Sequence, residues 1–198
     1  MRTALNEIEL PVRLRTEVPL SDDEFARFCA ANEPNRFERD ANGEIIVMSP
    51  TGIEGGGMEE VVNWELGAWA RSDGRGRVFG PATGFRLPDS SLRLADAAWI
   101  SWDRLNSMSR EQREGFGPIC PEFVSEVRSR TDRLSPLKEK MQVWIANGAE
   151  VAWLIDPIER VVTVYRRGAE PEEYVKPSSV QGTGPIAGFE LVLQRVWG

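Results

Sequence analysis

The 198-residue sequence contains no histidine, and its only cysteines are Cys29 and Cys120. The absence of histidine excludes a Ser-His-Asp triad, a histidine general base and a histidine-ligated zinc ion. Two isolated cysteines without a CxxC pair argue against a disulfide scaffold or a thiolate zinc site, and we interpret them as buried thiols in a reducing cytoplasm. Any catalysis therefore has to use carboxylates, lysine, hydroxyl groups or a metal ion bound by oxygen atoms.

A long apolar run and an excess of basic residues are also missing. No stretch approaches the roughly 18 apolar residues that a membrane-spanning helix needs, and the polar residues 1–11 do not resemble a signal peptide. The formal net charge is −7, whereas proteins that depend on nonspecific phosphate contacts are normally basic. We therefore expect a cytoplasmic protein with no membrane partner. The charge counts against tight DNA binding, but not against a site where a metal ion neutralises both the acids and a phosphate.

The composition that remains is that of an ordinary folded domain. Hydrophobic residues make up 41% and charged residues 28% of the chain without any break in composition, so we expect one domain over residues 1–198. Six tryptophans lie in apolar surroundings, which predicts that most of them belong to the core. They are Trp64, Trp69, Trp99, Trp102, Trp144 and Trp153.

Apolar spacing and capping residues predict the order of the elements. Helices are expected at residues 21–28, 58–70 and 135–146, with a partly helical segment at 103–114 and a flexible glycine lead at 55–57. The third helix is expected to start with Ser135 as cap and Pro136 at its first position, and to end at Asn147-Gly148. Strands are expected at 37–40, 44–48, 78–79, 84–87, 92–100, 123–128, 151–155, 161–165 and 189–193. This order predicts an α/β or α+β fold with a mixed sheet flanked by helices, an N-terminal hairpin and C-terminal strands.

One acid, Asp96, interrupts the otherwise apolar run at residues 92–100. As a strand, this run places Asp96 on an apolar face, where an ionised carboxylate is costly unless something compensates it. The predicted strand at 123–128 repeats the pattern with Glu126. Two half-buried acids on neighbouring strands repel each other, and a divalent cation or a buried lysine removes that repulsion. The pair therefore suggests catalysis.

The helix that follows Glu126 offers two lysines. Lys140 lies between two apolar positions on the helical wheel, whereas Lys138 lies nearer the polar side. An ammonium among apolar side chains needs an anionic partner, which Asp96 and Glu126 could supply. We therefore prefer Lys140 as the third member of the site.

Other charged residues leave alternatives open. Arg128, at the end of the strand that carries the second acid, could hold a phosphate bidentately or form a salt bridge with either candidate acid. For residues of these types, a structural ion pair is the more common explanation. Glu65 falls on the inward side of the helix at 58–70 and could join a site or pair with an arginine, and the roles of Glu59 and Glu60 stay unassigned.

These residue types suit phosphodiester hydrolysis. Two carboxylates and a backbone carbonyl match the octahedral oxygen coordination that Mg²⁺ prefers. The metal would lower the pKa of a bound water, while the lysine would orient that water or stabilise the developing charge. Such a mechanism needs no histidine, in agreement with the composition.

The chain resembles the Uma-type putative restriction endonuclease family of the PD-(D/E)XK nuclease superfamily. The segments that carry the resemblance are MSPTG at 48–52, TGFRLP at 83–88, DAAWI at 96–100, CPEFVSEVRS at 120–129, KMQ at 140–142, NG at 147–148, WLIDP at 153–157 and GF at 188–189. Their order and spacing match from about residue 10 to the C-terminus.

The resemblance implies a restriction endonuclease-like α-β-β-β-α-β core with extra strands, and cleavage of DNA that depends on Mg²⁺ or Mn²⁺. The acid of the PD motif falls on Asp96 and the acid of the (D/E)xK motif on Glu126, and both would bind the metal. The motif lysine would have moved from the position of Arg128 to Lys140. Ala95 replaces the motif proline. The resemblance also implies a homodimer, of which the sequence gives no direct sign.

Two other classes of function remain open. A catalytically inactive protein of this fold could serve as a binding or assembly module, which the acidic surface favours. The intact set of Asp96, Glu126 and Lys140 favours the nuclease. A β domain that binds carbohydrates or small molecules would explain the tryptophans, and it predicts that they are exposed in a cleft.

Overall fold

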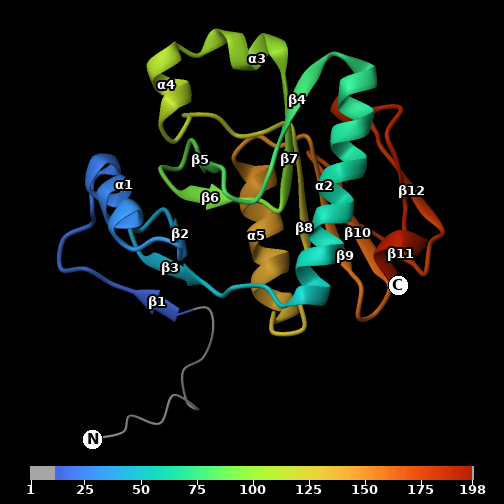
Figure 1. The fold of residues 1–198 in the computed structure, drawn as a ribbon, viewed down its shortest axis with the longest axis horizontal. Coiled ribbons are helices and arrows are strands. Elements are labelled where there is room, and N and C mark those ends of the chain that lie inside the picture. Colours follow the sequence, from blue (N-terminus) through green and yellow to red (C-terminus); the bar gives the residue numbers. More distant parts are fainter. Residues whose placement is uncertain (1–11, 198) are drawn as a thin grey trace, which may run out of the picture.

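The computed structural model describes residues 12–197, so the expectation for residues 1–11 lies outside the described part of the chain. Over residues 12–197, the fold is a mixed α+β arrangement of two larger β-sheets with helices packed against them (Figure 1). No helix in this range is long and apolar enough to cross a lipid bilayer.

A six-stranded sheet has the strand order β11-β10-β9-β8-β7-β4. Its members are β4 (Gly76–Phe79), β7 (Ala97–Ser101), β8 (Phe123–Val127), β9 (Val151–Asp156), β10 (Val161–Arg166) and β11 (Glu172–Val175). β8 and β9 run parallel, whereas the other neighbouring pairs are antiparallel. All of β9 is buried, as its continuous apolar run predicts for a strand covered on both faces.

A five-stranded sheet has the order β1-β3-β2-β6-β5 and lies beside the first (Figure 1). Its members are β1 (Val12–Leu14), β2 (Arg36–Arg39), β3 (Ile45–Met48), β5 (Gly84–Arg86) and β6 (Leu92–Leu94). β2 and β3 form the predicted hairpin. Helix α1 (Asp22–Ala31) packs against this sheet, and Ser21 caps it in a reciprocal capping box with Glu24.

Helices cover both faces of the six-stranded sheet (Figure 1). On one face lie α2 (Ile53–Asp73), the strand pair β12 (Ser179–Gln181) and β13 (Glu190–Val192), the short η2 (Gly184–Ile186) and α6 (Gln194–Trp197). On the other face lies α5 (Leu134–Ala146), with α3 (Trp102–Ser107) and α4 (Arg110–Glu114) at one end. The C-terminal strands and the partly helical segment are therefore where the sequence predicts them.

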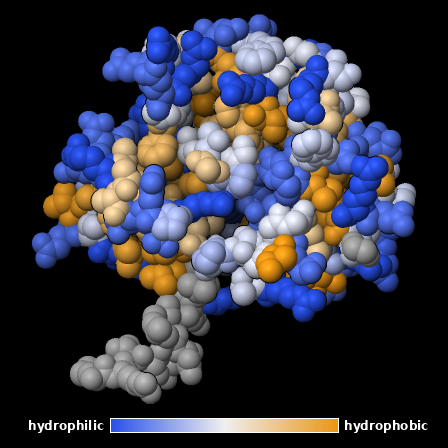
Figure 2. Space-filling model, in the orientation of Figure 1, coloured by the Kyte–Doolittle hydropathy of each residue, from blue (hydrophilic) through white to orange (hydrophobic). Residues whose placement is uncertain are grey.

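The tryptophan prediction is confirmed in part. Trp99, Trp144 and Trp153 are buried on the two faces of the six-stranded sheet, whereas Trp64 and Trp102 are 65% and 42% exposed. Trp102 lines a cleft of about 140 Å³ next to α3, and apolar side chains gather below α3 in the space-filling view (Figure 2).

The prediction of one strand over residues 92–100 is wrong. β6 ends at Leu94 in the five-stranded sheet, and β7 begins at Ala97 in the six-stranded sheet. The strand is interrupted because the chain passes between sheets here, so Leu92 packs near α1 and Ile100 packs near α5. Asp96 consequently lies at the junction of the two sheets.

The predicted helices exist, but some of their ends differ. α2 begins at Ile53, so the glycines at 55–57 are helical and do not form a flexible lead. α5 begins at Leu134 after Arg133, so Ser135 is not its cap. Pro136 fits the third helical position because first-turn N–H groups have no intrahelical partner to lose.

Candidate active site

Asp96 and Glu126 meet where the two sheets join. The antiparallel register of β7 and β8 pairs Ala97 with Ser125, so Asp96 and Glu126 each lie next to a member of this pair, and both line the same cleft. The Asp96 carboxylate accepts a hydrogen bond of 2.7 Å from the backbone N–H of Val127. Strand pairing therefore brings together two acids that are distant in the sequence.

Burial and like charge make ionisation of these acids unfavourable. Desolvation, followed by the nearby charges of Glu126 and Glu59, raises the pKa of Asp96 well above its ordinary value. Desolvation also raises the pKa of Glu126 to about 7, although Lys140 counteracts part of this effect. Among residues 12–197, no cationic side chain forms an ion pair with Asp96, so its charge is only partly compensated.

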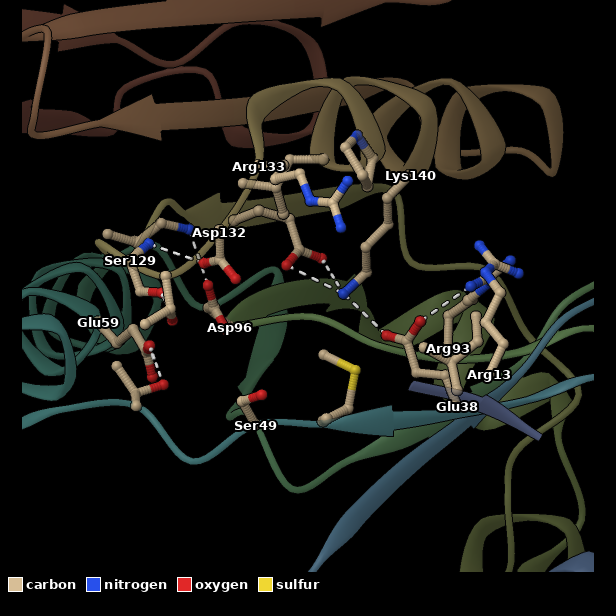
Figure 3. A pocket seen from close by; sticks show the side chains of 18 residues that line it. Arg13, Glu38, Ser49, Glu59, Arg93, Asp96, Ser129, Asp132, Arg133 and Lys140 are labelled. Carbon is tan, nitrogen blue, oxygen red and sulfur yellow. Dashed lines mark hydrogen bonds and ion pairs between the residues drawn. The ribbon is translucent and has the colours of Figure 1, made fainter. Parts of the chain in front are cut away.

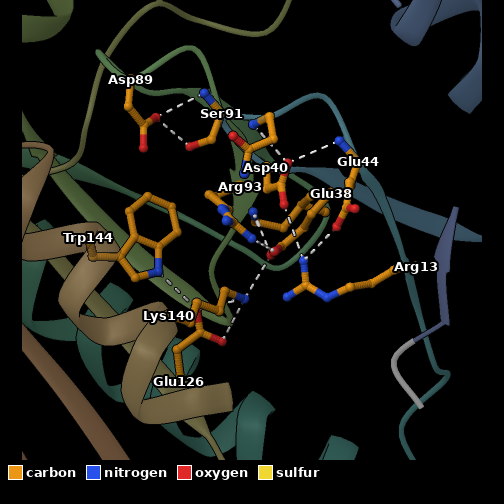
Figure 4. Close-up of polar contacts among 12 residues, drawn as sticks. Arg13, Glu38, Asp40, Glu44, Asp89, Ser91, Arg93, Glu126, Lys140 and Trp144 are labelled. Atoms are coloured by element: carbon orange, nitrogen blue, oxygen red, sulfur yellow. Dashed lines mark hydrogen bonds and ion pairs between the residues drawn. The ribbon is translucent and has the colours of Figure 1, made fainter. Parts of the chain in front are cut away.

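Lys140 supplies an ammonium group to the site. Its Nζ lies 2.9 Å from Oε1 of Glu126 and 2.8 Å from Oε1 of Glu38, and the Trp144 indole donates a hydrogen bond of 3.2 Å to Glu126 (Figure 4). Burial alone would lower the pKa of Lys140, but the charges of Glu126 and Glu38 outweigh it and raise that pKa. The ammonium therefore stays protonated.

The helical period explains why Lys140 reaches the site and Lys138 does not. Met141 and Trp144 pack α5 against the sheet, and the Lys140 side chain beside them is 11% exposed. Lys138 instead forms a 3.0 Å ion pair with Glu173 on β11, and both side chains are exposed at the surface. The choice of Lys140 from the helical wheel agrees with this arrangement.

Glu38 belongs to the same cluster, although sequence reasoning missed it. It lies on β2, its side chain is 2% exposed, and it accepts hydrogen bonds from Arg93 at 2.9 Å and from the Leu94 backbone N–H at 3.1 Å. No local pattern marks Glu38, because Arg93 and Lys140 are remote in the sequence. Its contacts come from β6 of its own sheet and from α5, so its burial follows only from the tertiary fold.

A cleft opens over these groups, with a volume of about 140 Å³ that adjoins a second cleft of about 470 Å³. In Figure 3, the Lys140 ammonium lies between an acidic end of the cleft and an end where arginines gather. The acidic end carries Asp96, Glu59 and Asp132, and the other end carries Glu38, Arg93 and Arg13. The cleft can therefore bind a cation and an anionic group side by side.

Of the other acids considered from the sequence, one lines the cleft and two do not. Glu59 on α2 lines the cleft and accepts a 2.9 Å hydrogen bond from the Thr51 hydroxyl, and burial raises its pKa. Glu65 pairs with Arg195 of α6, and Glu60 is exposed.

Arg128 forms an ion pair with neither Asp96 nor Glu126, so the predicted salt bridge is wrong, whereas the phosphate-binding alternative stays a prediction. Its guanidinium forms a 2.7 Å ion pair with Asp156 at the end of β9. Arg128 follows the last residue of β8, and its backbone N–H donates a 2.8 Å hydrogen bond to Ile155 of β9, which brings its side chain to Asp156 of the same strand.

The donor atoms suit a hard divalent cation. Carboxylate oxygens are preferred ligands of Mg²⁺ and Mn²⁺, and Mg²⁺ usually binds through one or two carboxylates with waters and substrate phosphates completing its shell. Within residues 12–197, no group of three or more acidic, cysteine or histidine side chains could hold a metal ion, so Asp96 and Glu126 would have to suffice. Near them, the three carboxylates of Asp96, Glu126 and Glu38 face two cations, Lys140 and Arg93, and this balance favours an added cation.

Comparison with known proteins places these features in context. A similar solved structure is the crystal structure of a putative nuclease belonging to DUF820 from Anabaena variabilis ATCC 29413, with a TM-score of 0.73, 19% sequence identity, and coverage of 90% of this chain and 98% of that chain. This likeness concerns the fold. A cryoEM structure of a DrdV–DNA complex matches only with a TM-score of 0.37 and 11% identity, over 57% of this chain and 9% of that chain, and carries no argument. The search of curated proteins found no match.

A family model decides the classification. The model of the Uma2 family, described as "Putative restriction endonuclease", matches residues 22–194. This range includes both larger sheets except β1, and all the cleft acids discussed above. The chain therefore belongs to the Uma2 family of putative restriction endonucleases.

Proposed function

We propose that the protein is a metal-dependent nuclease that hydrolyses DNA phosphodiester bonds. Asp96 and Glu126 would hold Mg²⁺ or Mn²⁺, and Lys140 would act on the attacking water or the developing charge. The observation that carries the proposal is that Asp96 and Glu126 line one cleft, close enough for their charges to interact, with the Lys140 ammonium 2.9 Å from Glu126. Membership of the Uma2 family supports the same class of reaction.

Each protein group has a defined task in this mechanism. A bound divalent cation would lower the pKa of a coordinated water and offset negative charge on the phosphate. Asp96 is held in place by the Val127 N–H, and Glu126 by the Trp144 indole, so both carboxylates are oriented before a cation arrives. Lys140 keeps its proton and would stabilise the negative charge of a phosphate bound in the cleft.

The proposal is tested by a plasmid-nicking assay with Mg²⁺, with Mn²⁺ and with EDTA. We expect Asp96→Asn to lower the cleavage rate by about 10³-fold or more, because one of two metal ligands is lost. Lys140→Met should lower it by about 10²-fold or more. Lys138→Met is the matched control, since Lys138 lies on the same helix but pairs with Glu173 away from the cleft. It should leave the rate unchanged.

Two results would contradict this function. One is a wild-type protein that cleaves no DNA with either metal and binds neither in calorimetry. The other is cleavage that persists undiminished in Asp96→Asn, which would point to a contaminating nuclease or to a different site.

The second candidate function is a catalytically inactive binding or assembly module. It is favoured by one observation: Lys140 already pairs with Glu126 and compensates part of its charge without a metal ion. The module predicts no cleavage in the assay above while the fold remains intact. The homodimer and the cytoplasmic location are further proposals, and light scattering tests the first of them.

A further inference from the structure

Glu38 is an acid of the five-stranded sheet that contacts Lys140 of helix α5. Its carboxylate receives three groups: the Lys140 ammonium at 2.8 Å, the Arg93 guanidinium at 2.9 Å and the Leu94 backbone N–H at 3.1 Å (Figure 4). Burial would raise the pKa of Glu38, but Lys140 and Arg93 outweigh it and lower that pKa. Glu38 is therefore a fixed, ionised carboxylate.

Lys140 depends on this carboxylate once a cation is present. The ammonium has two anionic contacts, Glu126 and Glu38. If Glu126 coordinates a cation, its oxygens are shared with that cation and hold the ammonium less strongly. Because a lysine side chain is long and flexible, an ammonium without a second anchor would then be held less firmly at the cleft.

We propose that Glu38 is a positioning residue that keeps the Lys140 ammonium at the cleft when Glu126 binds the catalytic cation. The inference rests on the proposed nuclease function and adds to it a residue outside the Asp96, Glu126 and Lys140 set. The five-stranded sheet would thereby take part in the reaction, since it supplies the anchor for the lysine of α5.

If Glu38 had only a structural role, a neutral hydrogen-bond acceptor would be enough at this position. The ladder between β2 and β6 has one register pair, Arg39 with Leu92, and the Glu38 carboxylate extends it by accepting from Leu94. A neutral glutamine oxygen could accept that same hydrogen bond. The negative charge is needed only by the cations, and one of these, Lys140, reaches the candidate metal ligand Glu126.

The test is a double-mutant cycle on the full-length protein. Glu38→Gln, Lys140→Met and the double variant are compared with wild type in steady-state cleavage of duplex DNA with Mn²⁺. We expect Glu38→Gln to lower kcat by at least about 10-fold with KM changed less than about threefold, because the lysine is misplaced in the transition state. In the Lys140→Met background, Glu38→Gln should have no further effect on kcat.

Glu122→Gln is the matched control. Glu122 is also a buried acid, 5% exposed, with an arginine partner, Arg104, and a hydrogen bond from the Ser101 hydroxyl, but it does not line the cleft. We expect it to lose stability in urea unfolding, as Glu38→Gln does, but to keep kcat. Glu38→Asp keeps the charge on a shorter side chain and should give an intermediate kcat, and this variant decides the matter if Glu38→Gln does not fold.

The outcomes distinguish the inference from the function on which it rests. A wild-type protein without cleavage under any metal overturns the proposed function and the inference with it. An active wild type whose Glu38 variants keep full kcat overturns the inference alone. The inference is also overturned if the variants are active and Glu38→Gln lowers kcat by the same factor in wild type and in the Lys140→Met background.

Discussion

Asp96 is placed where its charge costs stability, and this cost can be measured. Its raised pKa means that folding favours the protonated acid, so the unfolding free energy of metal-free protein falls as pH rises from the ordinary pKa of a carboxyl through the folded-state pKa. Asparagine cannot ionise, and its oxygen can still accept the Val127 N–H bond. We therefore predict that Asp96→Asn stabilises metal-free protein at pH 8 by about 1 kcal/mol while it abolishes cleavage.

Urea unfolding in EDTA at pH 8 and at pH 5 checks this prediction. The gain should shrink at pH 5, where wild-type Asp96 is closer to its protonated form. Mn²⁺ at pH 8 should stabilise wild type and leave Asp96→Asn unchanged. A variant less stable than wild type at both pH values would show that the Asp96 charge is well compensated in the fold.

At the level of single residues, the sites that could be predicted from the sequence were charged side chains surrounded by apolar positions. An acid in an apolar run and a lysine between apolar positions are such side chains, and the structure places Asp96, Glu126 and Lys140 at one cleft. Glu38 was not predicted because alternation in a hairpin assigns it to a solvent face. Only its tertiary contacts, with Arg93 and Lys140, bury it. Arg128 was misplaced because its partner, Asp156, belongs to a strand whose pairing is not visible in the sequence.

At the level of elements, type was predictable and boundaries were less so. Capping residues located α1, and Asn147-Gly148 ended α5, because these signals act locally. The break between β6 and β7 was not predictable, since an apolar run does not reveal that its halves join different sheets. The helical glycines at 55–57 were misassigned because the low helix propensity of glycine is a weak guide, and these residues continue the helix whose later turns pack on the sheet.

The glycines of α2 give a prediction at this scale. A methyl group added at Gly67 would meet nothing within 4 Å, whereas at Gly55 it would lie 2.5 Å from the Thr51 side chain. Alanine loses less backbone entropy than glycine in a helix, so Gly67→Ala should stabilise the protein by about 0.5–1 kcal/mol without changing cleavage. Gly55→Ala should stabilise it less or not at all. Urea unfolding of both variants measures this, and equal gains would mean that Thr51 moves aside freely.

At the level of the whole molecule, the two larger sheets share a core as well as the cleft. Phe85 of the five-stranded sheet packs edge-on against Trp144 of α5, with ring centroids 6.2 Å apart. The same core cluster contains Ile100 and Leu154 of the six-stranded sheet. The Glu38–Lys140 ion pair adds a buried polar contact between the five-stranded sheet and α5. The two sheets therefore share one of their core clusters, although each also has a cluster of its own.

We accordingly predict that both sheets unfold in one transition, as expected for a single domain. The seven tryptophans all lie outside α1 and the five-stranded sheet, whereas Cys29 lies on α1, half-buried against that sheet. In a Cys120→Ala variant, the reaction of Cys29 with a thiol reagent reports on one sheet, and tryptophan fluorescence reports on the other. The two midpoints in urea should coincide. If Cys29 reacts at lower urea than the fluorescence change, the five-stranded sheet opens first, and an anchor for Lys140 that depends on that sheet would then be lost before the main sheet unfolds.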